Sequence, residues 1–346
     1  MAYTTIKKPS DYFNTKLYTG DGSSSRSITG VGFQPDWVWF KQRSGTQSHT
    51  AIDAVRTGDS KIRINSTSAE FTGQSYNFNS DGFGWTTQDD ESNQNGSTYA
   101  SWNWKANGAG STNTVGDLTA TVSVNTTSGF SIVSYTGNGT SSTTIGHGLG
   151  VKPAMIIVKK LNGSYNWGIY HKDIGATKVL AFTTGTPDED TSYWNDVEPT
   201  SSVFYVGNGA LTNGSGSDMI AYCFAEKQGF SKFGSYAGNQ NNDGTFVYLG
   251  FKPAFVMVKR YSAGNPTATN WVILDNKRDT ENTVDKWLYP NANDSEYTSS
   301  SGETDFVSNG FKIRGTGSYY NDSGHNYIYM AFAEQPLVGD NPATAR

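Results

Sequence analysis

The sequence predicts an all-β protein made of three tandem, divergent β-sandwich modules of jelly-roll or lectin-like type. Three observations support this fold class: a composition poor in charge and rich in aromatic residues and glycine, one segment repeated three times, and frequent turn signals. Charged residues make up 16% of the chain, aromatic residues 14%, and there are 39 glycines. Aromatic side chains suit pleated strands and glycine suits turns, whereas helical bundles depend on Ala, Leu, Glu and Lys.

The repeated segment has the form Gly, apolar residue, Lys or Gln, Pro, any residue, about four apolar residues, and Lys. Each copy follows a Tyr-X-Gly-Asp/Asn motif and precedes a closing stretch rich in aromatic residues. The order of these three features is the same each time, so the chain contains three structural units. The repeated segments are Gly30–Lys41, Gly148–Lys159 and Leu249–Lys259; the upstream motifs start at Tyr18, Tyr135 and Tyr236; the closing stretches are Tyr99–Trp104, Ile220–Glu226 and Ile328–Glu334.

Composition shifts between the copies predict the module boundaries. The first sandwich spans residues 1–107, the second 129–228, and the third 229–346 with a short C-terminal tail. Residues 108–128 are rich in Gly, Ser, Thr and Asn, which predicts a linker. Within this linker, the period-two alternation of Asp117–Val124 predicts one additional strand.

The two apolar stretches of each copy have different strand patterns. The stretch after the proline is apolar on both faces, which predicts a central strand buried on both sides or beneath a partner subunit. The closing stretch alternates large and small residues, which predicts a strand of the second sheet packing on the first. Turn signals at Ser80–Phe83, Gly207–Gly209 and Ser308–Phe311 predict tight hairpins. A propeller is disfavoured because its blades are shorter, about 40 to 50 residues.

Charge and cysteine content exclude several classes of protein. The net charge is −5 and no basic stripe is present, so we expect no nucleic-acid partner. The single cysteine, Cys223, rules out an intrachain disulfide, and we expect it to be an inert buried thiol. No apolar run predicts membrane insertion, and the N-terminal residues lack the apolar core of a signal peptide. We therefore expect folding in a reducing cytoplasm.

No motif predicts catalysis or a cofactor. The four histidines, His49, His147, His171 and His325, have no metal-ligand spacing. We therefore predict no catalytic residue, no metal site and no cofactor.

Two alternative interpretations, glycoside hydrolysis and calcium binding, remain open. Asp53, Asp173, Asp275 and Asp279 are the candidate carboxylates for glycoside hydrolysis, but only some of them recur between copies, which favours a structural role. The loop Asn239–Gly244 and Asp294 offer oxygen ligands for calcium, with a solvated turn as the alternative interpretation.

Aromatic residues near turns are the candidate contacts for a host glycan, because exposed rings stack on sugars. Core packing is the alternative role for the same rings. The candidates are Trp85, Tyr193, Trp194, Trp287 and Tyr289.

Several motifs resemble those of structural proteins from marine bacteriophages, notably phages of cyanobacteria. The motifs are Met1–Ile6, Tyr12-Phe13, Leu17–Gly20, the Gly-Phe-Lys-Pro-Ala strands, Asn270–Asp275, Ala331–Glu334 and Pro342–Arg346. Such proteins carry a repeated domain of unknown function and include tail-fibre and other virion proteins. The first copy departs most, with Asp36 in place of alanine and His49 in place of tryptophan.

The resemblance implies a non-enzymatic virion protein, assembled in the host cytoplasm and carried outside the cell on the particle. We expect a tail fibre or a capsid-surface fibre or decoration protein that attaches to the host through loops at the sandwich ends. The expected partners are capsid or tail proteins and a host-surface glycan, and analogy with phage fibres predicts a homotrimer. A purely architectural protein that cements capsid or tail subunits is the alternative, and a polysaccharide depolymerase is a third possibility. The repeats favour a compact, knob-like shape over a shaft.

Overall fold

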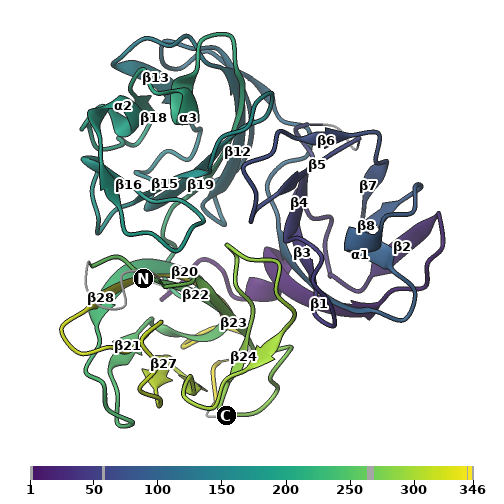
Figure 1. Ribbon diagram of the computed structural model, residues 1–346, viewed down its shortest axis with the longest axis vertical. Coiled ribbons are helices and arrows are strands. Elements are labelled where there is room, and N and C mark those ends of the chain that lie inside the picture. Colours follow the sequence, from purple (N-terminus) through teal and green to yellow (C-terminus); the bar gives the residue numbers. More distant parts are fainter. Residues whose placement is uncertain (1–2, 57–58, 263–268, 341, 345–346) are drawn as a thin grey trace.

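Each repeat folds into a β-sandwich in which a large antiparallel sheet faces a smaller one (Figure 1). The computed structural model describes residues 3–56, 59–262, 269–340 and 342–344. The predicted all-β fold is confirmed, and its few helices are single turns. Among the described residues, no helix has the length and apolar character needed to cross a bilayer.

We call the sandwiches module 1, module 2 and module 3 in chain order. Module 1 follows the short 3-10 helix η1 (Pro9–Asp11). Its large sheet has the order β1-β9-β3-β4-β5-β6 and its small sheet the order β2-β8-β7. The elements are β1 (Phe13–Thr19), β2 (Arg26–Thr29), β3 (Trp37–Gln42), β4 (Thr50–Asp53), β5 (Ser60–Arg63), β6 (Phe71–Thr72), β7 (Tyr76–Asn79), β8 (Gly82–Trp85), α1 (Asp90–Asn93) and β9 (Thr98–Trp104).

Module 2 repeats this arrangement with a large sheet of order β10-β11-β12-β19-β14-β15 and the two-stranded pairs β13-β18 and β16-β17. Its elements are β10 (Ser111–Asn113), β11 (Ala120–Asn125), β12 (Phe130–Thr136), β13 (Thr143–Gly146), β14 (Met155–Lys160), β15 (Gly168–His171), β16 (Lys178–Val179), β17 (Asp188–Glu189), α2 (Thr191–Trp194), β18 (Val203–Val206), α3 (Ala210–Asn213) and β19 (Asp218–Phe224).

Module 3 has a large sheet of order β20-β28-β22-β23, a small sheet of order β21-β27-β26 and the pair β24-β25. Its elements are β20 (Ser231–Ala237), β21 (Phe246–Tyr248), β22 (Phe251–Arg260), β23 (Val272–Asp275), β24 (Lys286–Trp287), β25 (Tyr297–Thr298), β26 (Thr304–Val307), β27 (Gly310–Ile313) and β28 (Asn326–Pro336).

The supposed linker is part of module 2. Residues 111–113 and 120–125 form β10 and β11, and β11 pairs with β12 from Ala120↔Tyr135 to Asn125↔Phe130. The strand predicted within the linker is therefore confirmed, whereas the prediction of a separate linker is wrong. Small polar residues suit an outer, half-exposed strand as well as a flexible connection, so composition did not separate the two.

The closing strand of each module lies in the same sheet as the strand after the proline. The register pairs Trp37 with Trp104 and Met155 with Phe224, with the equivalent pair in module 3. The prediction that the closing strand belongs to the second sheet is therefore wrong. Alternation shows that a strand has two environments, but not which neighbour pairs with its edge.

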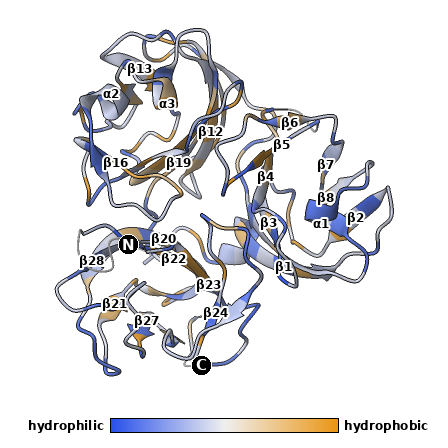
Figure 2. Cartoon of the chain, viewed as in Figure 1, coloured by the Kyte–Doolittle hydropathy of each residue, from blue (hydrophilic) through white to orange (hydrophobic). Residues whose placement is uncertain are grey.

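The large sheets of the three modules pack on one another around a common core, which explains why the strands after the prolines are buried on both faces (Figure 1). One face of β3, for example, contributes Val38 and Phe40 to the interior of module 1, and the other contributes Trp37 and Trp39 to the common core. The predicted burial of these strands is confirmed, and sister modules cover their second face. Figure 2 shows hydrophobic residues on strands facing the centre of the molecule.

Aromatic rings from different modules meet in this common core. Trp37 of module 1 stacks on Tyr222 of module 2 with ring centroids 4.4 Å apart, and Phe182 of module 2 lies 5.2 Å from Trp271 of module 3. Such pairs stabilise by about 0.5 to 1.5 kcal/mol each beyond the burial of their area. The modules therefore form one body rather than a flexible row.

The repeated Tyr-X-Gly motif ties each large sheet to a single-turn segment. In module 2, the Tyr135 hydroxyl donates to the Thr212 carbonyl at 2.6 Å, and the buried Asn213 side chain accepts from the Asn138 amide at 2.9 Å. Glycine is required at 137, because a Cβ there would lie 2.5 Å from the Gly214 carbonyl oxygen. The same contacts recur at Tyr18, Ser92, Asn93 and Asp21, and at Tyr236, Tyr320, Asn321 and Asn239.

Two of the three predicted hairpins are confirmed. Ser80 and Asp81 connect β7 to β8, and Ser308 and Asn309 connect β26 to β27. The segment Gly207–Gly209 instead leads from β18 into α3, so the hairpin predicted there is wrong. Its glycines allow close packing on α2, since the Gly207 amide donates to the Tyr193 carbonyl at 3.0 Å.

Candidate functional site

Three of the five predicted glycan contacts are core residues. Trp85, Trp194 and Trp287 are 1%, 2% and 3% exposed and pack inside their own sandwiches. Their expected role as exposed stacking platforms is therefore wrong. They lie near turns in the sequence, but Trp85 and Trp287 lie on strands whose register directs their rings between the sheets, and Trp194 ends the helix α2, which packs its ring into module 2.

The two predicted tyrosines are half-buried. Tyr289 lies with its ring centroid 6.3 Å from that of Trp287 and 6.0 Å from that of Tyr319, within an aromatic cluster of module 3. Burial raises its pKa well above the usual value. Tyr193 lies on α2 and lines a pocket in module 2.

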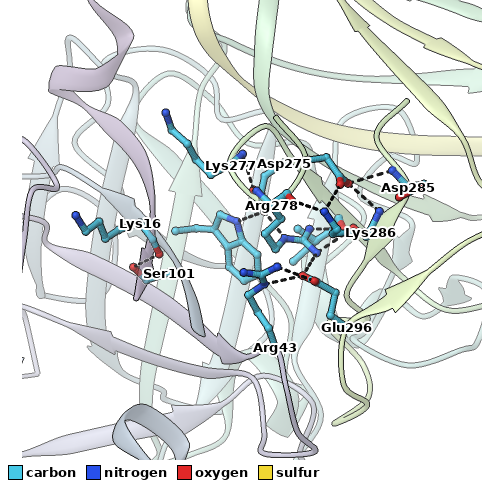
Figure 3. Close-up of polar contacts among 12 residues, drawn as sticks. Lys16, Arg43, Ser101, Asp275, Lys277, Arg278, Asp285, Lys286 and Glu296 are labelled. Atoms are coloured by element: carbon cyan, nitrogen blue, oxygen red, sulfur yellow. Dashed lines mark hydrogen bonds and ion pairs between the residues drawn. The ribbon is translucent and has the colours of Figure 1, made fainter. Parts of the chain in front are cut away.

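The carboxylates considered for hydrolysis are held in ion pairs, except Asp173, which is exposed. Figure 3 shows the group around Asp275 at the contact of modules 1 and 3. Asp275 accepts from Trp102 Nε1 at 3.1 Å and from Arg278 Nε at 2.5 Å, and both the Asp275 and Arg278 side chains are 0% exposed. Arg278 also pairs with Glu296 at 3.3 Å, and Glu296 receives two hydrogen bonds from Arg43 at 2.8 and 2.7 Å.

The other two carboxylates are engaged in the same way. Asp279 pairs with Lys286 at 2.7 Å. Asp53 pairs with Arg56 at 2.6 Å and accepts from the Tyr222 hydroxyl at 2.7 Å. These carboxylates stabilise the fold and the contacts between modules, and their hydrogen-bonding capacity is already used.

Equivalent positions at the ends of β4, β15 and β23 form a cycle of contacts between modules. Asp53 of module 1 contacts module 2, Asp275 of module 3 contacts module 1, and His171 of module 2 lies 3.3 Å from the Tyr329 carbonyl of module 3. Burial lowers the pKa of His171 to about 4, so its ring is neutral at pH 7. The residue type at this position differs between modules, but in each module the side chain contacts a neighbouring module.

Each repeated segment ends with a lysine in the sequence, and the structure shows that this lysine is buried. Lys159 and Lys259 reach neighbouring modules, donating to the carbonyls of Thr67 at 2.9 Å and Thr184 at 3.1 Å. Burial lowers the pKa of Lys159 to about 8 and that of Lys259 to about 7. Lys41, whose pKa burial lowers to about 8, donates to the Gly45 carbonyl of its own module at 2.9 Å.

Metal-type ligands do not converge in the described part of the chain. Within it, no three His, Cys, Asp or Glu side chains form a group that could hold a metal ion. In the loop considered for calcium, the side chains of Asn239 and Asn241 accept from backbone amides two residues later, and Asp243 pairs with Lys312 at 2.7 Å. Cys223 is buried on β19, and burial raises its pKa.

The structure brings one predicted residue, Tyr193, into a pocket with other polar and aromatic groups. This pocket of module 2 has a volume of about 240 Å³. Its polar and aromatic lining residues beside Tyr193 are Tyr165, Asn166, Asp188 and Ser192, and its other lining residues are Val179, Leu180, Ala181, Gly209, Ala210 and Leu211. We call it the module-2 pocket. Sequence reasoning missed Tyr165, although its position beside Asn162-Gly163-Ser164 is a turn signal that predicts exposure.

Short helices fix the walls of the module-2 pocket. The Asp190 side chain caps α2 by accepting from the Ser192 amide at 2.8 Å, and the Tyr193 carbonyl accepts from the Thr212 hydroxyl at 2.9 Å. Tyr165 is 41% exposed, and Lys160 Nζ lies 4.6 Å from its ring centroid.

The electrostatics keep the second tyrosine of the pocket as a hydrogen-bond donor. Burial, followed by the charges of Asp190 and Asp188, raises the pKa of Tyr193. Its phenol is therefore protonated at neutral pH. The pocket thus combines two aromatic rings with a carboxylate, an amide and hydroxyl groups, the groups that bind a neutral polyhydroxy ligand.

The corresponding region of module 1 is closed by charge pairs. The side chains of Lys61 and Arg63 on β5 pair with Glu91 of α1 at 2.8 and 2.6 Å. In module 3, the aromatic cluster of Trp287, Tyr289 and Tyr319 occupies this region. The open pocket in module 2 is therefore a property of its own side chains and not a requirement of the shared fold.

The family described as "Domain of unknown function (DUF7483)" matches residues 8–336. The chain belongs to this family. The DUF7483 match extends through all three modules, so the family corresponds to the whole three-module body and not to one repeat. Comparisons with curated proteins and with solved structures gave no match.

Proposed function

We propose that the chain is a non-enzymatic structural protein of a phage particle that attaches the particle to a host-surface glycan through the module-2 pocket. The observation that carries this proposal is the combination of Tyr165, Tyr193 and Asp188 in one small pocket on a body stiffened by a common core. A rigid scaffold lowers the entropic cost of holding the contact groups in place. The motifs that resemble marine phage proteins support the assignment to a virion.

The chemistry of the pocket favours a sugar over an ionic ligand. The C–H face of a sugar ring stacks on an aromatic ring, while its hydroxyls donate to a carboxylate and accept from an amide or phenol. Asp188 and Asn166 are both exposed and lie beside the two tyrosines. A neutral hexose within a surface polysaccharide is the ligand that best matches these groups.

Binding of the intact chain to a glycan array, followed by calorimetric titration of the best ligand, tests the proposal. We expect Tyr165→Ala and Asp188→Asn each to weaken binding about tenfold or more, which corresponds to the loss of one or two good contacts. Tyr297→Ala removes a tyrosine that is 50% exposed on module 3 and serves as the matched control. An absence of glycan binding, or equal weakening by the control, would contradict the glycan site.

The location on the particle is tested separately. A cryo-electron density map of the intact virion should place the chain at a fibre or on the capsid surface with module 2 facing outward. Burial of all three modules against capsid or tail subunits would favour the architectural alternative instead. The homotrimer stays a prediction. Within one chain, three modules already pack around a common core.

A further inference from the structure

The first strand of the small sheet is equivalent in the three modules but differs on its outer face. β2, β13 and β21 each place one buried aliphatic residue opposite a phenylalanine: Ile28 opposite Phe83, Ile145 opposite Phe204, and Val247 opposite Phe311. The residues on either side of it lie on the opposite face of the strand, away from the sandwich interior. They are Ser27 and Thr29 in module 1, Thr144 and Gly146 in module 2, and Phe246 and Tyr248 in module 3. The sandwich thus fixes the inner residue and leaves the outer two free to differ.

In module 2, a segment of the same chain covers this strand edge. The Asp117 amide donates to the Thr144 carbonyl, and the Thr144 amide donates to the Asp117 carboxylate, both at 2.9 Å. Gly116 forms a bridge with Ile145. A Cβ at Gly146 would lie 2.6 Å from the Val115 carbonyl oxygen, so the covering segment leaves no room for a larger residue.

In module 3, the equivalent edge presents two exposed aromatic residues. The Leu249 amide donates to Asn309, and the Ile313 amide donates to the Thr245 carbonyl. The alternation of an antiparallel ladder therefore turns the amides and carbonyls of Phe246 and Tyr248 away from β27. Their side chains are 44% and 50% exposed.

The chemistry of this edge favours a strand as its partner. Outward amides and carbonyls on an edge are a template for pairing with another chain, and exposed aromatic residues add apolar area that association would bury. Lys232 lies at one end, donating to the Tyr248 carbonyl at 2.9 Å with its Nζ 5.3 Å from the Tyr248 ring centroid. Module 1 has serine and threonine here, side chains that water can solvate, so the aromatic pair is specific to module 3.

We propose that β21 pairs antiparallel with β21 of a second copy of the chain about a two-fold axis. In this register, Phe246 of each copy lies opposite Tyr248 of the other, which gives two cross-strand aromatic pairs. The outward backbone groups can then form hydrogen bonds, with the Tyr248 carbonyl accepting through the lone pair that Lys232 does not use. The edge is complementary to itself, so the contact closes at a dimer. The interface is short, and the dimer forms at high local concentration, as when many copies sit on one particle.

Sedimentation equilibrium of the full chain from micromolar to millimolar concentration tests the proposal, which does not depend on glycan binding. We expect a monomer–dimer equilibrium and slower hydrogen exchange at the Phe246 amide as concentration rises. The double variant Phe246→Ser with Tyr248→Thr gives β21 the outward residues of β2. It should keep its circular dichroism spectrum and melting temperature while dimerisation weakens at least tenfold.

Tyr297→Thr removes another half-exposed tyrosine from module 3 and should dimerise as the wild type does. A wild-type chain that stays monomeric at millimolar concentration overturns the proposal. Dimerisation that survives the double variant, or assembly into a trimer instead, also overturns it.

Discussion

Replacing Asp275 with asparagine should lower the free energy of unfolding by about 3 kcal/mol. Breaking a buried ion pair by removing one partner costs about 3 to 5 kcal/mol, because the remaining charge stays buried without full compensation. The Arg278 side chain is 0% exposed, and the carboxylate that remains near it is Glu296 at 3.3 Å, which also pairs with Arg43. Arg278 also keeps its hydrogen bonds to the Lys286 and Ile273 carbonyls at 2.9 and 2.8 Å. That remaining carboxylate places the expected loss at the lower end of the range. The amide oxygen can still accept from Trp102, whereas the amide nitrogen cannot accept from the Lys277 and Arg278 backbone amides, which donate to Asp275 Oδ1 at 3.0 and 2.9 Å. The loss therefore includes these two hydrogen bonds as well as the charge.

Urea unfolding followed by tryptophan fluorescence measures this loss. The double variant Asp275→Asn with Arg278→Met should be more stable than Asp275→Asn alone, because it also removes the uncompensated cation. Lys152→Met serves as the matched control, since it breaks an ion pair to Glu198 whose side chains are 47% and 45% exposed. Such a pair contributes less than about 1 kcal/mol. A loss for Asp275→Asn no larger than that of the control would refute the reasoning.

Two further predictions concern buried polar groups of the repeats. Burial lowers the pKa of Lys259 from 10.5 to about 7, so the unfolded chain binds more protons between these values and stability rises with pH through that window. From about pH 7 to about pH 8.5, we expect deprotonation of Lys259 to raise the free energy of unfolding by about 2 kcal/mol. Urea unfolding at both pH values should show a smaller rise for Lys259→Met than for the wild type. An equal rise in both proteins would contradict the assignment. Asn213→Ala should cost about 2 to 4 kcal/mol, because the Asn213 amide donates to the Thr140 and Gly207 carbonyls at 2.9 and 2.8 Å and both acceptors lose their donor. Thermal unfolding checks this loss, and the exposed Asn162→Ala should leave the melting temperature unchanged.

The strands of the fold could be predicted because their apolar residues alternate or fill both faces, and this pattern reports burial. What covers a buried face could not be predicted in the same way. The apolar run at Trp37–Phe40 is explained equally well by a second sheet, a partner subunit or a sister module, and the structure shows the sister modules. Small polar residues are common to linkers and outer strands, so composition predicts a linker at Val115–Leu118, where the structure has a segment covering the edge of β13.

The candidate site shows a similar limit. The turn-rich neighbourhoods of Trp85 and Trp287 suggested exposure, but in a strand a shift of one residue reverses the face that a ring occupies. Tyr193 is half-buried, and its place in one pocket with Asp188 depends on how α2 packs against β16 and β18, which no local pattern encodes. The ion pair between Arg43 and Glu296 joins residues of different modules, so sequence spacing could not reveal it.

A single chain with three unequal modules differs in a consequential way from a symmetric trimer of one module. In a symmetric trimer, any pocket or unpaired strand edge would occur three times, and an exposed aromatic edge such as Phe246 and Tyr248 would be present on every subunit. Here, equivalent contacts between modules use unequal residues: Asp53 meets Tyr222, Asp275 meets Trp102, and His171 takes the aspartate's place in module 2 and meets the Tyr329 carbonyl. The outer surfaces are then free to diverge. Module 2 is covered at its edge and has the open pocket, whereas module 3 has its pocket region filled by aromatic rings and its edge open. We infer that this division separates ligand binding from self-association, so that glycan binding should be unchanged when β21 is given the outward residues of β2.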